Sequence, residues 1–382
     1  MSLLSKFLEE TSSIFFKDYQ IQSKLATGGS SEIYLAEPLK SDSSVIIKSP
    51  FFSKNSGTNL LKEANLMLQL KDVTGVPQIL ESIVNENCEA LIIQRLGQSL
   101  DMLVKEYMNF SLKTVIMVAK QMIATLQRIH GKAIIHRDIK PGNILISKNS
   151  NSKQIFLIDY GLAKKFLNSK GCHKLFNVKR NSFKGTLMFA SRNTHFGYSN
   201  SRRDDLESLG YTLVYLYKGF LPWSNWHKSN LDVRSLGKIK NQCYAQGVFA
   251  DLPLEFKQFF DYVGKLKYED VPDYDFLIEL FNDMAKRYEF DMQVHKWEWT
   301  DESCSETSFN DSMRKSNEDE FEKPCEKEID DESFFDSFNT IQRNLLVLNI
   351  NPMGIRKFSM GNSKSKELKQ LKNKFQKLVL QK

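Results

Sequence analysis

Two short segments constrain this chain more than any other part of it. Residues 134–146 read Ile-Ile-His-Arg-Asp-Ile-Lys-Pro-Gly-Asn-Ile-Leu-Ile, and residues 158–161 read Ile-Asp-Tyr-Gly. The first segment places Asp138, Lys140 and Asn143 on one short loop between apolar runs. Asp138 is suited to accept a hydroxyl proton, Lys140 to reach a phosphate, and Asn143 to offer an oxygen ligand to Mg²⁺. The loop therefore predicts phosphoryl-transfer chemistry.

Each tripeptide by itself is weak evidence, because Asp, Asn and Gly are ordinary turn residues. The joint order, with apolar strands on both sides, resembles the catalytic loop and the metal-binding loop of protein kinases. The resemblance implies that the chain uses ATP and that Asn143 and Asp159 bind Mg²⁺. Strand patterns up to about Gln94, followed by helical patterns at 112–131, 204–218 and 254–265, predict an α+β, bilobal, protein-kinase-like fold. ATP is expected in the cleft between the small β-rich N-terminal lobe and the larger helical C-terminal lobe.

Partners for this loop lie upstream. The run Val45–Lys48 is an apolar strand that ends in lysine, at the position that the resemblance gives to the kinase strand lysine. Apolar residues at helical spacing predict a helix over 59–70, and Glu63 lies on it. An ion pair between Lys48 and Glu63 would hold the lysine against the α- and β-phosphates. The ordinary alternatives are an edge lysine that reaches water and a solvated glutamate.

The segment 25–34, Leu-Ala-Thr-Gly-Gly-Ser-Ser-Glu-Ile-Tyr, lies where the resemblance places the phosphate-covering loop. Of the expected G-x-G-x-x-G pattern only the middle glycine, Gly28, is kept, because Ala26 and Ser31 replace the outer two. Ala and Ser retain the backbone N–H groups that bind phosphate, although a side chain is disfavoured wherever φ is positive. The altered loop is the main argument for weak ATP binding.

Residues 185–223 indicate which kinases the chain resembles. Most protein kinases carry Ala-Pro-Glu in this segment, whereas this chain has Ser191-Arg192-Asn193, then Thr-His, and then the run 201–211. These residues closely resemble the casein kinase 1 family of Ser/Thr protein kinases. Further stretches with the same resemblance are 75–77, 96–100 and 272–274.

The resemblance to casein kinase 1 implies roles residue by residue. Asp205 matches the helix aspartate that braces the catalytic loop, and Thr186 matches the threonine that contacts Asp138 and Lys140. Tyr160 stands where the family usually has Phe. The implied catalytic residues are Lys48, Glu63, Asp138, Lys140 and Thr186. The implied nucleotide-binding residues are Leu25, Gly28, Ile33, Lys48, Ile93 as gatekeeper, Gln94 and Leu96 of the hinge, Asn143 and Asp159.

The same family prefers protein substrates that carry a phosphate or an acidic group three residues before the target. It reads that anion with a basic pocket, and Arg234 falls on one pocket position. Met188 replaces the arginine of another position, and Arg180, Lys184 and Arg192 are nearby candidates to compensate. The chain is accordingly expected to be an ATP-dependent Ser/Thr kinase of acidic or phosphoprimed proteins.

Composition sets further bounds. The five cysteines form no C-x-x-C pair, which predicts reduced thiols in an intracellular protein, cytoplasmic or nuclear, and no zinc framework. No run of apolar residues is long enough for a membrane span. The net charge of +7 suits acidic substrates, but the Lys and Arg excess is spread along the chain without a motif for sequence-specific nucleic-acid binding. The expected state is a monomer.

The pattern along the chain predicts an N-terminal extension at 1–16, a protein kinase domain at 17–300 and two tails. The acidic tail, 301–336, holds 14 Asp or Glu against 4 Lys or Arg and is expected to be disordered. In the basic tail, 337–382, apolar residues at helical spacing among lysines predict an amphipathic helix. Such a helix could bind the kinase domain itself or an anionic surface, and a solvated, frayed end is the alternative.

A rival interpretation is a pseudokinase that acts as an interaction scaffold without catalysis. The altered glycine loop favours it. The presence of the whole implied catalytic and metal-binding set opposes it, because a chain without catalysis would be free to lose those residues.

Overall fold

The computed structural model describes residues 15–16, 18–27, 31–40, 43–50, 57–85, 88–178, 183–224, 232–245, 247, 249, 251–293 and 297–300. All of them belong to one compact unit, Met1–Glu322. The predicted tails at 301–336 and 337–382 lie outside the described residues, as do Gly28 and Arg180 of the predicted sites.

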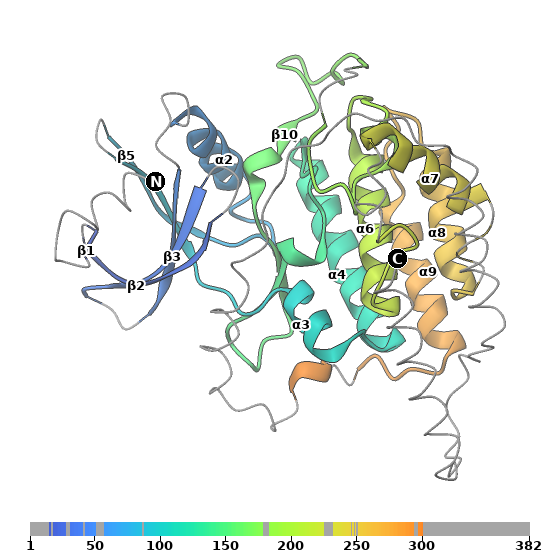
Figure 1. Cartoon of the computed structure of the whole chain (residues 1–382), viewed down its shortest axis with the longest axis horizontal. Coiled ribbons are helices and arrows are strands. Elements are labelled where there is room, and N and C mark those ends of the chain that lie inside the picture. The colour runs from blue at the N-terminus through green and yellow to red at the C-terminus, as the bar shows by residue number, and fades with distance from the viewer. Residues whose placement is uncertain are drawn as a thin grey trace, which may run out of the picture. The chain divides into compact units, whose positions relative to one another are not determined.

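The N-terminal part is an antiparallel sheet in the order β1-β2-β3-β4-β6-β5. Its strands are β1 Phe15–Phe16, β2 Tyr19–Thr27, β3 Ser31–Pro38, β4 Val45–Pro50, β5 Ile79–Asn85 and β6 Cys88–Gln94. β1 pairs with β2, so the sheet begins inside the predicted N-terminal extension. Helix α2, Gly57–Gln69, lies beside the sheet (Figure 1).

Alternation along β4 decides which side chains face the functional site. Val45 and Ile47 are buried in a core with Tyr34, Ala36 and Ile92. Because successive strand residues point to opposite faces, Lys48 points away from this core. The alternative that Lys48 is an edge lysine that reaches water is wrong, because its side chain contacts Glu63 on α2.

The C-terminal part is mostly helical (Figure 1). Its helices are α3 Leu100–Tyr107, α4 Leu112–Gly131, α5 Arg192–His195, α6 Arg202–Lys218, α7 Val233–Ala245, α8 Leu254–Lys265 and α9 Tyr274–Arg287. Its short strands are β7 Ile134–Ile135, β8 Ile144–Ile146, β9 Ile155–Leu157 and β10 Lys164–Lys165, and its 3₁₀ turns are η1 Pro141–Asn143, η2 Tyr160–Leu162 and η4 Glu298–Thr300. The fold is the bilobal α+β kinase arrangement that the sequence predicts.

The predicted helices compare closely with the observed ones. α4 and α8 have the predicted bounds, whereas α2 and α6 begin two residues earlier than predicted. The start of α6 is fixed by a capping box, in which the Asp204 carboxylate accepts the backbone N–H of Ser201 at 2.7 Å. This cap is a local signal in the sequence, and it explains the earlier start.

The pairing of β8 with β9 brings the two diagnostic segments together. Ile144 lies opposite Leu157, and the N–H of Ile158 donates to the carbonyl of Asn143 at 2.9 Å. The residue before β8 and the residues after β9 therefore lie at the same end of this ribbon. This is the end at which Asp138, Asn143 and Asp159 gather.

Two further sequence expectations concern the described residues alone. None of the helices that the structure describes is both long and apolar enough to cross a membrane. Cys172 and Cys243 are free thiols, the first exposed and the second buried.

Candidate active site

Lys48 joins two carboxylates from different parts of the fold. Its Nζ lies 2.8 Å from both carboxylate oxygens of Glu63 on α2 and 2.9 Å from Oδ1 of Asp159. The predicted Lys48–Glu63 ion pair is thus present. Glu63 is buried, whereas the Asp159 side chain is 44% exposed to solvent. The lysine therefore has one buried anchor and one partner that remains accessible.

The pKa values follow this geometry. Burial by itself lowers the pKa of Lys48, but the charges of Asp159 and Glu63 outweigh it and the pKa is raised. Burial raises the pKa of Glu63 although Lys48 opposes it. For Asp159 the order is reversed, because Lys48 outweighs burial and the pKa is lowered. Asp159 is therefore held as an anion beside a cation, which suits a metal ligand.

The backbone at Asp159 adopts a left-handed conformation, with φ 65° and ψ 77°. Its carboxylate turns back to accept the N–H of Gly161 at 3.4 Å. A Cβ at Gly161 would lie 3.3 Å from Asp159 Oδ1 and 3.4 Å from Glu63 Oε2. Glycine at this position lets the backbone pass close to both carboxylates.

The catalytic loop carries a compact network around Asp138. Thr186 donates to Asp138 Oδ1 at 2.8 Å, and Lys140 Nζ lies 3.0 Å from Oδ2. Lys140 also donates to Thr186 Oγ1 at 2.8 Å. Asn143 Nδ2 donates to the carbonyl of Asp138 at 2.9 Å and to its Oδ2 at 3.0 Å. The predicted contacts of Thr186 are present, and Asn143, by using its amide nitrogen, keeps its oxygen for another partner.

Asp205, which is fully buried in α6, holds the backbone of this loop through hydrogen bonds. Its two oxygens accept the backbone N–H groups of His136 at 2.7 Å and of Arg137 at 2.8 Å, as the resemblance implies. Its Oδ2 also lies 3.0 Å from His130 Nε2. Burial raises the pKa of Asp205, but these hydrogen bonds and the nearby histidines lower it overall. The bracing residue is thus held as a carboxylate.

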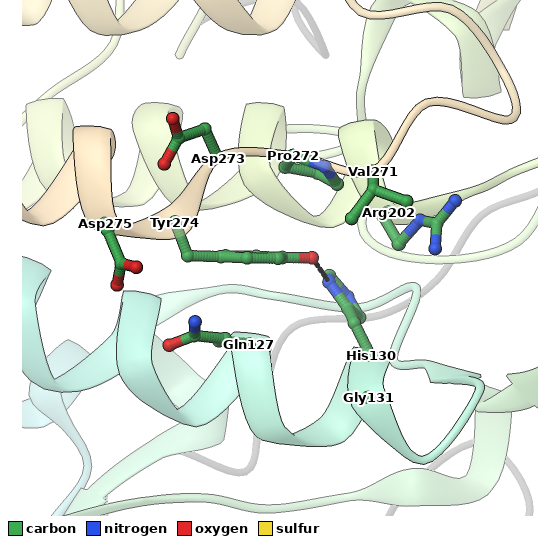
Figure 2. A pocket seen from close by; sticks show the side chains of 9 residues that line it. All are labelled: Gln127, His130, Gly131, Arg202, Val271, Pro272, Asp273, Tyr274 and Asp275. Atoms are coloured by element: carbon green, nitrogen blue, oxygen red, sulfur yellow. Dashed lines mark hydrogen bonds between the residues drawn. The ribbon is translucent and has the colours of Figure 1, made fainter.

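His130 and Tyr274 extend the hydrogen-bond network beyond Asp205. The hydroxyl of Tyr274, the first residue of α9, lies 2.6 Å from His130 Nδ1, and Figure 2 shows it pointing at the imidazole. Both residues line a small pocket at the start of α9, together with Gln127, Gly131, Arg202, Val271, Pro272, Asp273 and Asp275. The series Tyr274, His130, Asp205 connects α9 through α4 and α6 to the loop backbone.

The imidazole of His136 connects the two diagnostic segments. Its Nδ1 accepts the N–H of Asp138 at 3.3 Å, and its Nε2 lies 3.0 Å from the carbonyl of Ile158. One ring nitrogen thus contacts the first diagnostic segment and the other contacts the second. Arg137 adds a third link, since its Nε donates to the carbonyl of Leu162 at 2.6 Å.

The residues predicted to bind the nucleotide lie on the sheet and on the segment after it. Leu25 is in β2, and Ile33 in β3 lies directly opposite Lys48. Ile93 and Gln94 end β6, and the Gln94 N–H donates to the Gln78 carbonyl at 2.9 Å. Next comes Leu96, half-buried, before the N–H of Gly97 donates to the Ile146 carbonyl at 2.9 Å. This last bond ties the hinge segment to β8.

The predicted anion-pocket residues that the structure describes lie at the protein surface. Arg234 is exposed on α7, and Lys184 is exposed just before Gly185. Arg192, a suggested substitute for the arginine that Met188 replaces, has its guanidinium in contact with other groups. Arg192 Nε lies 2.9 Å from Glu207 Oε1, and its guanidinium stacks over the Tyr244 ring at 4.7 Å.

The donor set fits a divalent cation of the Mg²⁺ type. Asp159 supplies a partly exposed carboxylate, and Asn143 offers an amide oxygen at the neighbouring end of the β8–β9 ribbon. Within the part of the chain that the structure describes, no cluster of three or more His, Cys, Asp or Glu could hold a metal by itself. A cation held by few protein ligands together with phosphate oxygens is the usual Mg²⁺ arrangement.

Sequence reasoning missed three residues around the site: His130, His136 and Lys240. The first and last lie on apolar stripes, His130 four residues after Leu126 in α4 and Lys240 four residues after Leu236 in α7. A polar residue in such a stripe is the signal that could have found them.

Comparison with known families agrees with this geometry. Residues 19–268 match the family model of the protein kinase domain. The matched range contains every residue of the network around Asp138, Lys48 and Asp159.

Proposed function

Since the chain belongs to the protein kinase family, we propose that it is an active Ser/Thr protein kinase that transfers the γ-phosphate of ATP to acidic or phosphoprimed proteins. The observation that carries the proposal is the network of Asp138, Thr186 and Lys140, with each contact within 3.0 Å. A chain that had lost catalysis would have no need to keep this arrangement.

In the proposed reaction Asp138 accepts the proton of the substrate hydroxyl as its oxygen attacks the γ-phosphorus. Thr186 fixes Oδ1 of Asp138, and Lys140 and Asn143 contact Oδ2, so three side chains orient the carboxylate that would accept the proton. Lys140 Nζ stabilises the charge on the migrating phosphoryl group. Lys48, held by Glu63, binds the α- and β-phosphates. The proton ends on Asp138, and ADP is the leaving group.

Asn143 and Asp159 would hold the divalent cation, for which Mg²⁺ is the proposed identity. When bound, the cation neutralises the negative charge of the phosphates. Leu25, Ile33, Ile93 and Leu96 would surround the adenine. The Gln94–Leu96 backbone would hydrogen-bond its edge.

The substrate class rests on the resemblance to casein kinase 1 and on the basic residues near the site. Exposed Arg234 and Lys184 are the described candidates for an anion pocket. A charge-assisted contact to a phosphate contributes about 1.5–3 kcal/mol, which corresponds to about ten-fold or more in kcat/KM. Arg234→Ala should therefore reduce kcat/KM on a phosphoprimed peptide by about that factor. Equal losses on primed and unprimed peptides would exclude this role.

A non-catalytic scaffold is the second candidate, and the altered glycine loop is the observation that favours it. Ser31 begins β3 with a buried side chain, at a position where kinases usually carry glycine. The Ala26→Gly and Ser31→Gly variant lowers the KM for ATP if these side chains hinder the loop. An unchanged KM would indicate that the loop already fits the nucleotide.

The deciding experiment is phosphorylation of casein and of an acidic peptide with Mg·ATP. The expected result is phosphoserine or phosphothreonine in the product, abolished in the Asp138→Asn variant and retained in Lys238→Met, an exposed position on α7. Binding of ATP without any transfer by the wild-type protein would favour the scaffold.

A further inference from the structure

Lys240 is a lysine at the centre of the C-terminal part, with only 1% of its surface exposed. It lies on the buried side of α7 together with Leu236, Ile239 and Cys243. Lysine is rarely buried unless its ammonium group is fully paired. Its partners therefore identify what the residue does.

All the hydrogen bonds of Lys240 go to one short loop. Its Nζ donates to the carbonyls of Leu187 at 2.9 Å, Met188 at 3.1 Å and Ala190 at 2.7 Å. The same loop turns tightly, because the Thr186 carbonyl accepts the N–H groups of Phe189 at 3.0 Å and Ala190 at 2.9 Å. The turn aims three carbonyl dipoles at one point, where a positive charge stabilises them.

The remaining surroundings of Nζ also favour a cation. The Tyr211 ring lies 4.9 Å away and the Trp223 ring 5.1 Å away, measured to their centroids. Aromatic faces attract ammonium groups, and a neutral amine would turn its lone pair toward a carbonyl or a ring. Burial lowers the pKa of Lys240 well below its ordinary value, and the charge of Glu207 only partly opposes that decrease. The geometry around Nζ, with three carbonyl acceptors and two aromatic rings, favours the ammonium form.

The loop that Lys240 holds begins at the residue that contacts Asp138. Thr186 bonds Asp138 and Lys140 through its side chain and starts the turn through its carbonyl. Trp223 Nε1 adds a donor to the Met188 carbonyl at 2.8 Å. Thr186 and the 187–190 turn thus form one continuous segment. A shift of the turn would also shift Thr186 relative to the catalytic loop.

We propose that Lys240 is a positioning residue, whose ammonium holds the 187–190 turn and thereby the Thr186 hydroxyl against Asp138. The inference rests on the proposed function, because Thr186 matters only if Asp138 acts on a substrate. It goes beyond that function by assigning a role to a buried cation that touches neither nucleotide nor metal residues.

The test compares Lys240→Met, which keeps the length and removes the charge, with Lys240→Arg and with the exposed control Lys238→Met. We expect Lys240→Met to lower kcat for peptide phosphorylation by about ten-fold or more while the KM for ATP stays within about two-fold. The reason for this split is that Lys48, which the proposed function places at the phosphates, has its hydrogen bonds among the described residues with Glu63 and Asp159 and not with the turn. Lys240→Arg should regain part of kcat, and Lys238→Met should match the wild type.

Unchanged kcat in Lys240→Met would overturn the proposal. So would a loss of kcat accompanied by an equal rise in the KM for ATP, since that indicates general damage to the fold. A wild-type protein that phosphorylates nothing would instead refute the proposed function.

A measurement on the wild-type protein keeps the inference testable if Lys240→Met does not fold, and it needs no activity. In protein labelled with ¹⁵N-lysine, Lys240 should give a side-chain NH₃⁺ signal whose protons exchange slowly with water. The signal is assigned by its loss in Lys240→Arg, and other lysines serve as internal comparison. A neutral NH₂ signal for Lys240 at neutral pH would overturn the proposal.

Discussion

The hydroxyl of Thr186 donates a 2.8 Å hydrogen bond to Oδ1 of Asp138. Oγ1 of Thr186 in turn accepts a hydrogen bond from Lys140 Nζ at 2.8 Å, so the ammonium fixes the direction in which the hydroxyl proton points. Thr186 lies outside the catalytic loop, in the segment that Lys240 anchors. The relationship therefore joins two separate parts of the chain in one network.

The first prediction concerns this hydroxyl. Thr186→Val keeps the branched shape and removes the donor, so the Asp138 carboxylate loses its orientation. We expect kcat to fall by about ten-fold to a hundred-fold, the equivalent of about 1.5–3 kcal/mol for a bond to a charged group. Steady-state kinetics on an acidic peptide measure this effect. Thr186→Ser retains the hydroxyl and should retain most of kcat; a Ser variant as slow as Val would contradict the role of the hydrogen bond.

The second prediction concerns Gly185, the residue before Thr186. Its φ is +111°, and a Cβ there would lie 2.8 Å from the carbonyl of Arg137. Gly185→Ala must therefore displace either the turn or the catalytic loop, and we expect both lower stability and lower kcat. Gly171 is a matched control, because its φ is +76° but a Cβ there would meet nothing within 4 Å.

Thermal unfolding and peptide kinetics on both glycine variants separate the effect of backbone strain from that of the steric clash with the Arg137 carbonyl. Gly171→Ala should cost about 1 kcal/mol from the backbone conformation alone and leave kcat intact. Equal effects of the two substitutions on kcat would show that the contact with Arg137 is irrelevant.

The part of the site that could be predicted from the sequence is the part encoded locally. The helix that carries Glu63 and the strand that ends in Lys48 followed from two short patterns, whereas the pairing of the two residues was predicted with the help of the resemblance to protein kinases. Asp205 and Thr186 needed the family resemblance, because they reach the loop from 69 and 48 residues away along the chain. The end of α4 was predictable because its apolar stripe ends in a glycine.

What could not be predicted depends on partners that are distant in sequence. Arg192 looks like a candidate for phosphate binding until Glu207, on α6, is seen to take its guanidinium. The apolar stripe around Lys240 indicates burial, but nothing in its neighbours along the chain shows that three carbonyls converge on it. Tertiary contacts decide such charges, and a single sequence does not display them.

The third prediction concerns Tyr160, which stands where related kinases have Phe. Its side chain is fully buried, and among the described residues its hydroxyl has no hydrogen-bond partner. Burial raises the pKa of this hydroxyl, so it stays neutral. The ring already packs edge-on against His136 at 4.9 Å, which Phe can reproduce.

Tyr160→Phe should therefore raise the free energy of unfolding by about 1–2 kcal/mol, because an unsatisfied buried hydroxyl is removed. Urea denaturation at neutral pH measures the change, and Tyr211→Phe is the matched comparison. The Tyr211 hydroxyl donates to Glu207 at 2.6 Å, so its removal should destabilise the protein. A destabilised Tyr160→Phe variant would mean that the hydroxyl has a partner after all.

The fourth prediction concerns Asp204, the buried capping-box residue of α6. Its Oδ1 accepts the hydroxyl of Ser191 at 2.7 Å, and its Oδ2 accepts the Ser201 N–H at 2.7 Å. Burial nevertheless raises the pKa of this carboxyl to about 6, against the opposing effects of Arg203 and these hydrogen bonds. The usual pKa of an unfolded Asp is about 3.9.

The sign of the pH effect follows from these two values. Between about pH 4 and pH 6 the folded protein binds a proton at Asp204 that the unfolded chain has released, so this group makes stability fall as the pH rises. The contribution is fully present at low pH and is lost above about pH 6. A pKa difference of about 2 units corresponds to a change of about 3 kcal/mol. Asp204→Asn cannot titrate and supplies the reference.

The measurement is urea denaturation of the wild type and of Asp204→Asn at several pH values between 4.5 and 7.5. Subtracting the two stability curves cancels the titration of the other groups that both proteins share. The difference, wild type minus variant, should decrease as the pH rises toward about 6 and then level off. A difference that increases with pH would show that the hydrogen bonds from Ser191 and Ser201 outweigh burial. In that case the carboxylate, and not the acid, would be the form that caps α6 throughout.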